Sequence, residues 1–532
     1  MESINHLFKE KEEVMIKKFS TVALATMLAL PTLAAAGGGA SVADLEKKME
    51  EMTKAFNAQI QSLQQEVSDL KSADKDLMAT DDQLSSSIAS AGTKVAPAPA
   101  GKKITLGGQI RMRGYNLQNV WSFDDDRDYD NWDVFRHKTT IWAKIDATEK
   151  VSGFVALSNQ NWGEGPSTVD AGNWEIDNMS NKVFVDNAYI NVKDMLDMPV
   201  DLRIGRQNVM YGTGFVLFDG NSQFGSTSIF LDGLKASWRI TDNVTVDGLY
   251  FKDWEGSRDN TSGTEDDITM GGLYLTNKAC PLTGAKQEFY ALNRTDDSMN
   301  KDIWMYGIRM SDKLDCGFDY SLEGAIQRGE AYEDSITGEN VDQDAYGVKL
   351  GGGYTFKDVK MQPRVSLGYA FLSGDENQDA NDDDNERWDV FYGGHAPQFG
   401  DIIAFKYLNV GGGNSIGQSY DPTYNQLSST GGEAVYSNLQ NITLGASANL
   451  VKNLSANVSW SMLEADETAS GYDDEIGDVY QLTLKYKYTP KLSFRLYSAL
   501  FEAGDAFDDP TTAVDERDDD ATEVFLEADY RF

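Results

Sequence analysis

Apolar and polar residues alternate with a period of two along much of the chain after residue 103. Segments 104–115, 478–488 and 523–532 each place aliphatic or aromatic residues on one face and mostly polar or charged residues on the other. In the last segment the apolar face consists of Val524, Leu526, Ala528, Tyr530 and Phe532, and the polar face of Glu523, Glu527, Asp529 and Arg531. Such two-faced segments predict β-strands.

The connections between these predicted strands alternate in length. The short ones are 147–150, 193–199, 241–243, 280–284, 311–315, 356–360, 451–453 and 489–491. Between them lie long acidic insertions at 124–130, 162–182, 254–267, 329–342, 373–433, 465–478 and 503–520, whereas 294–301 is short. With the glycine-containing loop that follows Gly205-Arg206-Gln207 as the ninth, eight turns joined to nine loops predict an all-β, transmembrane antiparallel β-barrel of about 18 strands (16–18) over residues 104–532. A soluble β-sandwich of this length would be unusual.

Composition excludes several other classes. The chain has 532 residues, and after the first forty no apolar stretch approaches the roughly 18 residues of a membrane-spanning helix. The formal net charge of -38 argues against nucleic acid as a partner. Cys280 and Cys316 have no metal or haem spacing, so no cofactor is expected. They fall about two strands apart, and we expect them to be unpaired.

The N-terminal region predicts export from the cytoplasm. From Met15, a basic start at Lys17 and Lys18 is followed by an apolar run and by small residues around Ala36. We therefore interpret 1–36 as a signal peptide, with Met15 as the true start. Together with the barrel, this indicates the outer membrane of a Gram-negative cell, with both barrel termini in the periplasm.

Residues 37–92 have a helical pattern instead. Apolar residues between 42 and 88 recur at spacings of three and four, interrupted by a stutter at 52–60. This predicts a periplasmic coiled-coil helix through which copies of the chain self-associate; a single solvated helix is the alternative. The Ala/Pro-rich residues 93–103 predict an extended linker.

The C-terminal strand would close the barrel against the first strand. Tyr530 and Phe532 then lie in the aromatic girdle of the membrane interface. Outer-membrane proteins as a class end in a similar way, and their assembly machinery recognises this ending. The bilayer and its lipopolysaccharide are the other expected partners.

An eighteen-stranded barrel encloses an aqueous lumen, so passage of solutes is the expected function. The alternation assigns more basic than acidic residues to the lumen. The expected acids are Asp146, Asp201, Asp247, Asp319, Glu323, Glu527 and Asp529. The basic residues predicted in the strands are Arg111, Arg113, Arg136, Lys138, Lys144, Lys235, Arg239, Arg309, Arg364, Lys485, Lys487, Arg495 and Arg531. Such a lining favours anions; alternatively, these cations pair with carboxylates and brace the wall.

Two stretches resemble the alginate-export family of outer-membrane porins. In 202–238 the resemblance is carried by Gly205-Arg206-Gln207, Tyr211-Gly212 and Asp232-Gly233, and in 367–402 by a Ser-Gly-Asp loop and an aromatic stretch. The resemblance implies a monomeric eighteen-stranded barrel with an electropositive pore for a polyuronate or another anion. It also implies pore-lining roles for Arg206 and, more weakly, Arg203. The coiled coil instead resembles the N-terminal helices of trimeric porins.

Two other functions are alternatives for a barrel of this kind. A barrel could serve as a structural sheath for a partner such as a multihaem cytochrome. An outer-membrane hydrolase would need a positioned histidine or carboxylate pair, and the histidines are His6, His137 and His395, the last with Asp389 nearby. Acidic clusters could bind Ca²⁺, although none matches an EF-hand; the candidates are Asp124, Asp125, Asp126, Asp518, Asp519 and Asp520.

Overall fold

The computed structural model describes most of the C-terminal part of the chain. The described residues are 103–119, 132–161, 183–219, 229–254, 267–281, 283–333, 338, 340–376, 384–392, 437–468, 473–507 and 519–532. The predicted signal peptide, coiled coil and linker lie outside them, except that Lys103 already begins the first strand. In the described part of the chain, no helix is long and apolar enough to cross a membrane.

The described chain is almost entirely β-structure, apart from two single-turn 3₁₀ helices, η3 (Met195–Asp197) and η5 (Asp505–Phe507). The first nine strands are β1 (Lys103–Gln118), β2 (Trp132–Asp146), β3 (Val151–Asn161), β4 (Val183–Val192), β5 (Val200–Gln207), β6 (Leu231–Arg239), β7 (Val244–Trp254), β8 (Ile268–Asn277) and β9 (Lys286–Asp296). The others are β10 (Lys301–Lys313), β11 (Phe318–Glu333), β12 (Asn340–Thr355), β13 (Arg364–Leu372), β14 (Asp384–Asn385), β15 (Leu439–Val451), β16 (Leu454–Glu464), β17 (Glu475–Lys487), β18 (Leu492–Ala503) and β19 (Ala521–Arg531).

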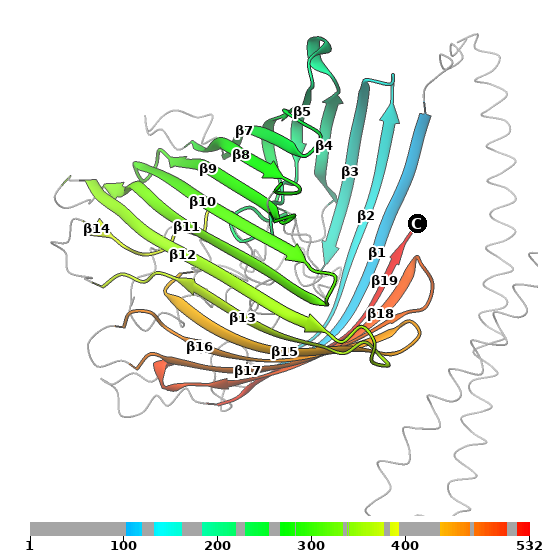
Figure 1. Cartoon of the computed structure of the whole chain (residues 1–532), viewed down its shortest axis with the longest axis vertical. Coiled ribbons are helices and arrows are strands. Elements are labelled where there is room, and N and C mark those ends of the chain that lie inside the picture. Colours follow the sequence, from blue (N-terminus) through cyan, green and yellow to red (C-terminus); the bar gives the residue numbers. More distant parts are fainter. Residues whose placement is uncertain are drawn as a thin grey trace, which may run out of the picture. The chain divides into compact units, whose positions relative to one another are not determined.

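These strands form one closed barrel (Figure 1). Each wall strand pairs antiparallel with its neighbours in sequence, and β1 pairs with β19, so the sheet has no free edge. The two-residue β14 pairs in parallel with β12 and lies in the connection between β13 and β15, which pair directly. The barrel wall therefore has eighteen strands, as the connections predicted.

All eight predicted short turns join strands at one end of the barrel, called here the turn end. The opposite end, the loop end, carries the other connections. Two details differ from expectation. β11 and β12 extend through most of the predicted 329–342 insertion, which leaves only 334–339 between them. The connection 208–230, predicted only as a glycine-containing loop, is long.

The two faces of the wall have opposite characters. Outward-facing side chains are mainly apolar and exposed, as in Ile104, Leu106 and Leu526, which suits contact with lipid. Charged and aromatic side chains alternate with them and point into the lumen. Cys280 lies near the turn between β8 and β9, and Cys316 lies near the turn between β10 and β11.

The chain end completes the closure. The backbone amides and carbonyls of Phe532 and Gly108 exchange two hydrogen bonds of 3.1 Å. Tyr530 and Phe532 lie on the outward face, where their rings stack with centroids 5.8 Å apart. A side chain at position 108 would place its Cβ 2.5 Å from the Phe532 ring, so glycine permits this close approach. The aromatic ending therefore packs against β1.

Candidate pore lining and lumenal loops

The lumen-facing side of β17, β18, β19, β1 and β2 carries two transverse rows of charge, called here the basic wall. Strand register places each member beside the next, on strands about 4.8 Å apart. The first row is Lys485, Arg495, Glu527, Arg113 and Arg136. The second is Asp529, Arg111 and Lys138. Each row contains a single carboxylate among its cations.

Glu527 organises the centre of the basic wall. Arg113 Nε donates to its Oε2 at 2.5 Å, and Arg495 donates to its Oε1 through Nε at 3.1 Å and Nη2 at 2.6 Å. Arg111 Nε lies 3.9 Å from Oε2. The guanidinium carbons of Arg113 and Arg495 lie 4.6 and 5.4 Å from the ring centre of Phe525. One carboxylate and one ring therefore hold these arginines in place.

The opposite wall, on β8 to β12, balances its charges more evenly. Arg309 donates to Glu288 and lies 3.6 Å from Glu323. The register continues this row to Lys349 on β12. Acids and cations alternate along it, whereas cations outnumber carboxylates in the two rows of the basic wall.

Residues 208–219, the first lumenal loop, turn inward from the end of β5. Tyr211 stacks on Tyr274 of β8 at 3.9 Å between ring centres, and Tyr274 stacks on Tyr290 of β9 at 5.4 Å. The Tyr211 hydroxyl donates to Asp247 at 2.5 Å. Burial, and then the charge of Asp247, raise the pKa of Tyr211, so this hydroxyl keeps its proton. These contacts fix the start of the loop against the lumen wall.

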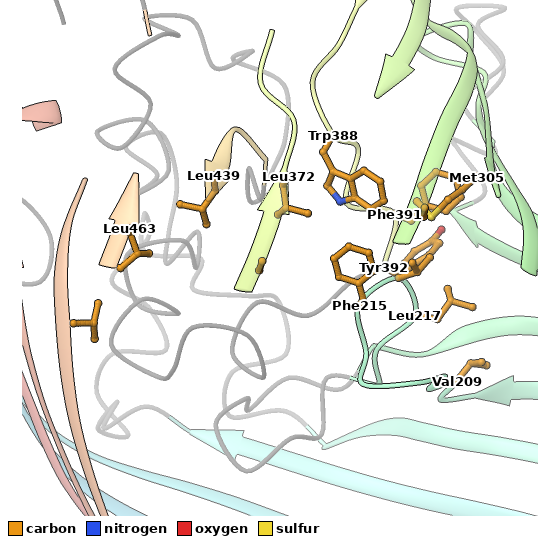
Figure 2. Close-up of a cluster of buried hydrophobic side chains, with 14 of the residues drawn as sticks. Val209, Phe215, Leu217, Met305, Leu372, Trp388, Phe391, Tyr392, Leu439 and Leu463 are labelled. Atoms are coloured by element: carbon orange, nitrogen blue, oxygen red, sulfur yellow. The ribbon is translucent and has the colours of Figure 1, made fainter. Parts of the chain in front are cut away.

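Residues 384–392, the second lumenal loop, lie beside the first. The backbones meet where Phe218 N donates to Tyr392 O at 2.9 Å and Tyr392 N donates to Val216 O at 3.2 Å. Phe215 and Trp388 stack with ring centres 5.4 Å apart (Figure 2). A Cβ on Gly347 of β12 would lie 3.0 Å from both rings, so a larger residue there would crowd them. The two loops therefore share one apolar cluster inside the barrel.

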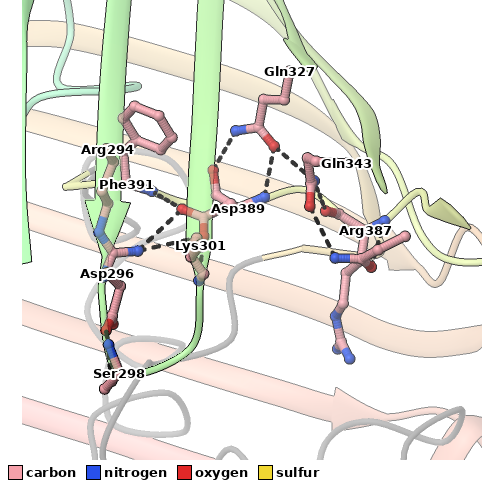
Figure 3. A network of polar contacts seen from close by, with 10 residues as sticks. Arg294, Asp296, Ser298, Lys301, Gln327, Gln343, Arg387, Asp389 and Phe391 are labelled. Carbon is pink, nitrogen blue, oxygen red and sulfur yellow. Dashed lines mark hydrogen bonds and ion pairs between the residues drawn. The ribbon is translucent and has the colours of Figure 1, made fainter. Parts of the chain in front are cut away.

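A polar network ties the second lumenal loop to the wall (Figure 3). Lys301 Nζ donates to Asp389 Oδ2 at 2.9 Å, and Arg294 Nη1 lies 3.3 Å from both carboxylate oxygens. Gln327 donates to Asp389 O at 2.5 Å, and Gln343 donates to Arg387 O at 2.6 Å.

Asp389 is the charged centre of this network. Burial opposes its ionisation, but Lys301, Arg294 and a hydrogen bond from the Phe391 amide together lower its pKa below the usual range. The carboxylate therefore stays ionised and holds the loop against β9 and β10.

The predicted basic residues lie on the lumen face with one exception. Those placed there are Arg111, Arg113, Arg136, Lys138, Lys144, Arg203, Lys235, Arg239, Arg309, Arg364, Lys485, Lys487, Arg495 and Arg531. Several are paired, as the bracing alternative expected: Arg239 with Asp201, Lys235 with Asp247, and Arg364 with Asp319. The lumen therefore contains both ion-paired bracing groups and the basic wall.

The prediction for Arg206 is wrong. Arg206 lies two residues after Ile204, which is exposed on the outward face, so both side chains lie on that face. Its direct neighbour on β6 is Asp232. Arg206 Nε and Nη2 donate to the Asp232 carboxylate at 2.8 and 2.7 Å. It therefore forms an ion pair on the outside of the barrel, near the loop end.

The remaining predicted site residues are the candidate calcium ligands and the histidines. Asp124, Asp125, Asp126 and Asp518 lie outside the described residues, as do His6 and His395. The part of the chain that is described, which includes Asp519 and Asp520, contains no group of three or more His, Cys, Asp or Glu that could hold a metal ion. His137 Nε2 lies 2.9 Å from Asn159 Oδ1.

A closed eighteen-stranded barrel with an apolar outer face and a charged lumen defines the class of outer-membrane channels. The alginate export family model matches residues 174–518, and the chain belongs to this family. No curated protein sequence matches it.

Several solved structures are similar. For OprD of Pseudomonas aeruginosa, identity is 13%, the match covers 81% of this chain and 94% of that one, and the TM-score is 0.48. For OpdK of the same organism, identity is 10%, the match covers 81% of this chain and 98% of that one, and the TM-score is 0.49. For OccAB4 of Acinetobacter baumannii, identity is 10%, the match covers 82% of this chain and 100% of that one, and the TM-score is 0.49.

Proposed function

We propose that this outer-membrane channel conducts small anionic solutes by passive diffusion, with the turn end and both barrel termini in the periplasm. The observation that carries the proposal is the basic wall. It presents Arg111, Arg113, Arg136, Lys138 and Arg495 on adjacent strands, with Glu527 and Asp529 as the carboxylates in register among them. Cations fixed in a narrow aqueous passage lower the energy of a passing anion.

The lumenal loops support a pathway for small solutes beside the basic wall. Both loops are anchored on the β7 to β12 side, through Tyr211, Asp389 and the aromatic cluster. They narrow the lumen there. A solute that passes them would run along the more positive side.

The same arrangement weakens the structural-sheath alternative. A multihaem partner would need a wide and open lumen, and the apolar cluster around Phe215 and Trp388 occupies part of it. A uronate polymer or another anion remains within the proposal, since carboxylates suit the same cations. We also retain the proposal that residues 42–88 join copies of the chain in the periplasm.

Solute uptake tests the proposal. Proteoliposomes containing the purified chain should take up succinate faster than putrescine, which has the same number of carbon atoms and the opposite charge. We expect the preference to weaken at high salt, because ions screen fixed charges. Protein-free vesicles give the background. Equal uptake, or faster uptake of putrescine, would contradict anion conduction.

A further inference from the structure

A lumenal cavity of about 370 Å³ lies at the turn end, between β2 and β6. This volume falls in the range of about 300–1,000 Å³ that is usual for small-ligand sites. Five cationic and three carboxylate side chains line it, together with hydroxyl and amide groups such as Ser152 and Asn191. The cavity is therefore polar, and it adjoins the basic wall, which also includes β2.

Arg203 is fixed in this cavity by two neutral groups. Its Nε donates to Asn191 Oδ1 at 2.9 Å, and its guanidinium carbon lies 4.3 Å from the ring centre of Tyr189. Tyr189 in turn stacks on Phe154 at 5.1 Å, and Phe154 stacks on Trp142 at 5.8 Å. The guanidinium therefore caps an aromatic row that crosses β2, β3 and β4.

Two of the three carboxylates that line the cavity, Asp146 and Asp201, are engaged by other cations. Asp201 accepts hydrogen bonds from Arg239 and from the backbone amide of Asp194, and Asp146 lies 3.0 Å from Lys144. Within the described part of the chain, the terminal nitrogens of Arg203 have no hydrogen-bond partner. Lys235, the direct neighbour of Arg203 on β6, forms an ion pair with Asp247 at 2.9 Å, which leaves Arg203 as the cation of the two that is not held by a carboxylate of the described residues.

We propose that this cavity, centred on Arg203, is a binding site for a small carboxylate at the turn end of the pore. A planar guanidinium held through Nε presents its two terminal nitrogens in the geometry that a carboxylate accepts. Ser152 and Asn191 offer further donors around the cavity. This inference rests on the proposed function. It adds a saturable binding site that the anion would occupy on its way through the pore.

Block of chloride current by succinate tests the site. The full chain is inserted in one orientation in a planar bilayer, and succinate is added to either chamber. Addition at the turn end should block at lower concentration than addition at the loop end. Arg203→Gln should raise the half-blocking concentration at the turn end by about ten-fold, because a charge-assisted bidentate contact is lost. The half-blocking concentration of Arg203→Lys should lie between those of the wild type and Arg203→Gln, because lysine keeps the positive charge but lacks the two parallel donors of the guanidinium.

Lys357→Gln is the matched control. Lys357 lies in the turn 356–363 at the same end, where its Nζ donates to Asp315 O at 2.8 Å, and it does not line the cavity. It should leave the block unchanged. Heat-modifiable migration on a gel checks that each variant folds.

The outcomes separate the two proposals. If the wild-type channel prefers chloride to potassium, but succinate blocks Arg203→Gln at the same concentration as the wild type, the binding site is overturned and anion conduction stays intact. A wild-type channel that prefers potassium would overturn the proposed function itself.

Discussion

Neutralising Arg111, Arg136 and Lys138 together should lower the chloride-to-potassium permeability ratio of the pore by about ten-fold. At short range, a unit charge contributes about 1 kcal/mol in water and more near low-dielectric walls, and 1.4 kcal/mol corresponds to a factor of ten. Salt screens part of the effect of three charges. Glutamine is the replacement, and Arg113 and Arg495 stay to bind Glu527.

The matched control removes three cations from the outward face. Each of them lies two residues after an exposed, outward-facing residue of its strand: Arg206 after Ile204, Lys252 after Tyr250 and Arg328 after Ile326. Replacing all three with glutamine should leave the permeability ratio near the wild-type value. Zero-current potentials of single channels give the ratios. Equal effects of the two triple variants would show that the position of the charge in the lumen is irrelevant.

Asp389→Asn should release the second lumenal loop and raise single-channel conductance. The change leaves Arg294 and Lys301 buried without the carboxylate that pairs with them. Removing one partner of a buried pair costs about 3–5 kcal/mol, and this loss falls on the ion pairs that join the loop to β9 and β10. We also expect noisier open-channel current, because the freed segment would move in the pore.

Asp297→Asn is the control for this change. Asp297 is exposed in the tight connection between β9 and β10, close in sequence to Arg294 and Lys301. Its replacement should leave conductance and noise as they are. If Asp389→Asn also conducts as the wild type does, the polar network does not hold the loop.

The sequence predicts the barrel well because its signals are local. Alternation shows which residues share a face, and the lengths of the connections show which strand ends lie together. These two signals placed Arg113 and Arg495 in the lumen and gave the number of wall strands. They could not show that Glu527 binds both arginines, since that depends on closing β19 against β1 across more than 400 residues.

For Arg206, the alternation of apolar and polar residues predicts the correct face of the strand, and the family resemblance does not. Leu202 and Ile204 precede it with the same parity, so the period of two already indicates the outward face. The Gly-Arg-Gln resemblance favoured the lumen instead. The adjacent Gln207 is the residue of that motif that is buried on the lumen face.

The lumenal loops were largely missed, because loops carry no periodic signal. The aromatic run from Trp388 to Tyr392, within an acidic insertion, was the available indication of burial. Pairing of Asp389 with Arg294 and Lys301 brings together residues about ninety positions apart, and no spacing rule predicts it.

The most direct test of the account is the zero-current potential of the wild-type channel in a steep KCl gradient. The basic wall should make chloride more permeant than potassium, so the potential should have the sign set by chloride. It should shrink toward zero in Arg111→Gln/Arg136→Gln/Lys138→Gln. A wild-type potential with the sign set by potassium would contradict the claim that the lumenal cations govern passage.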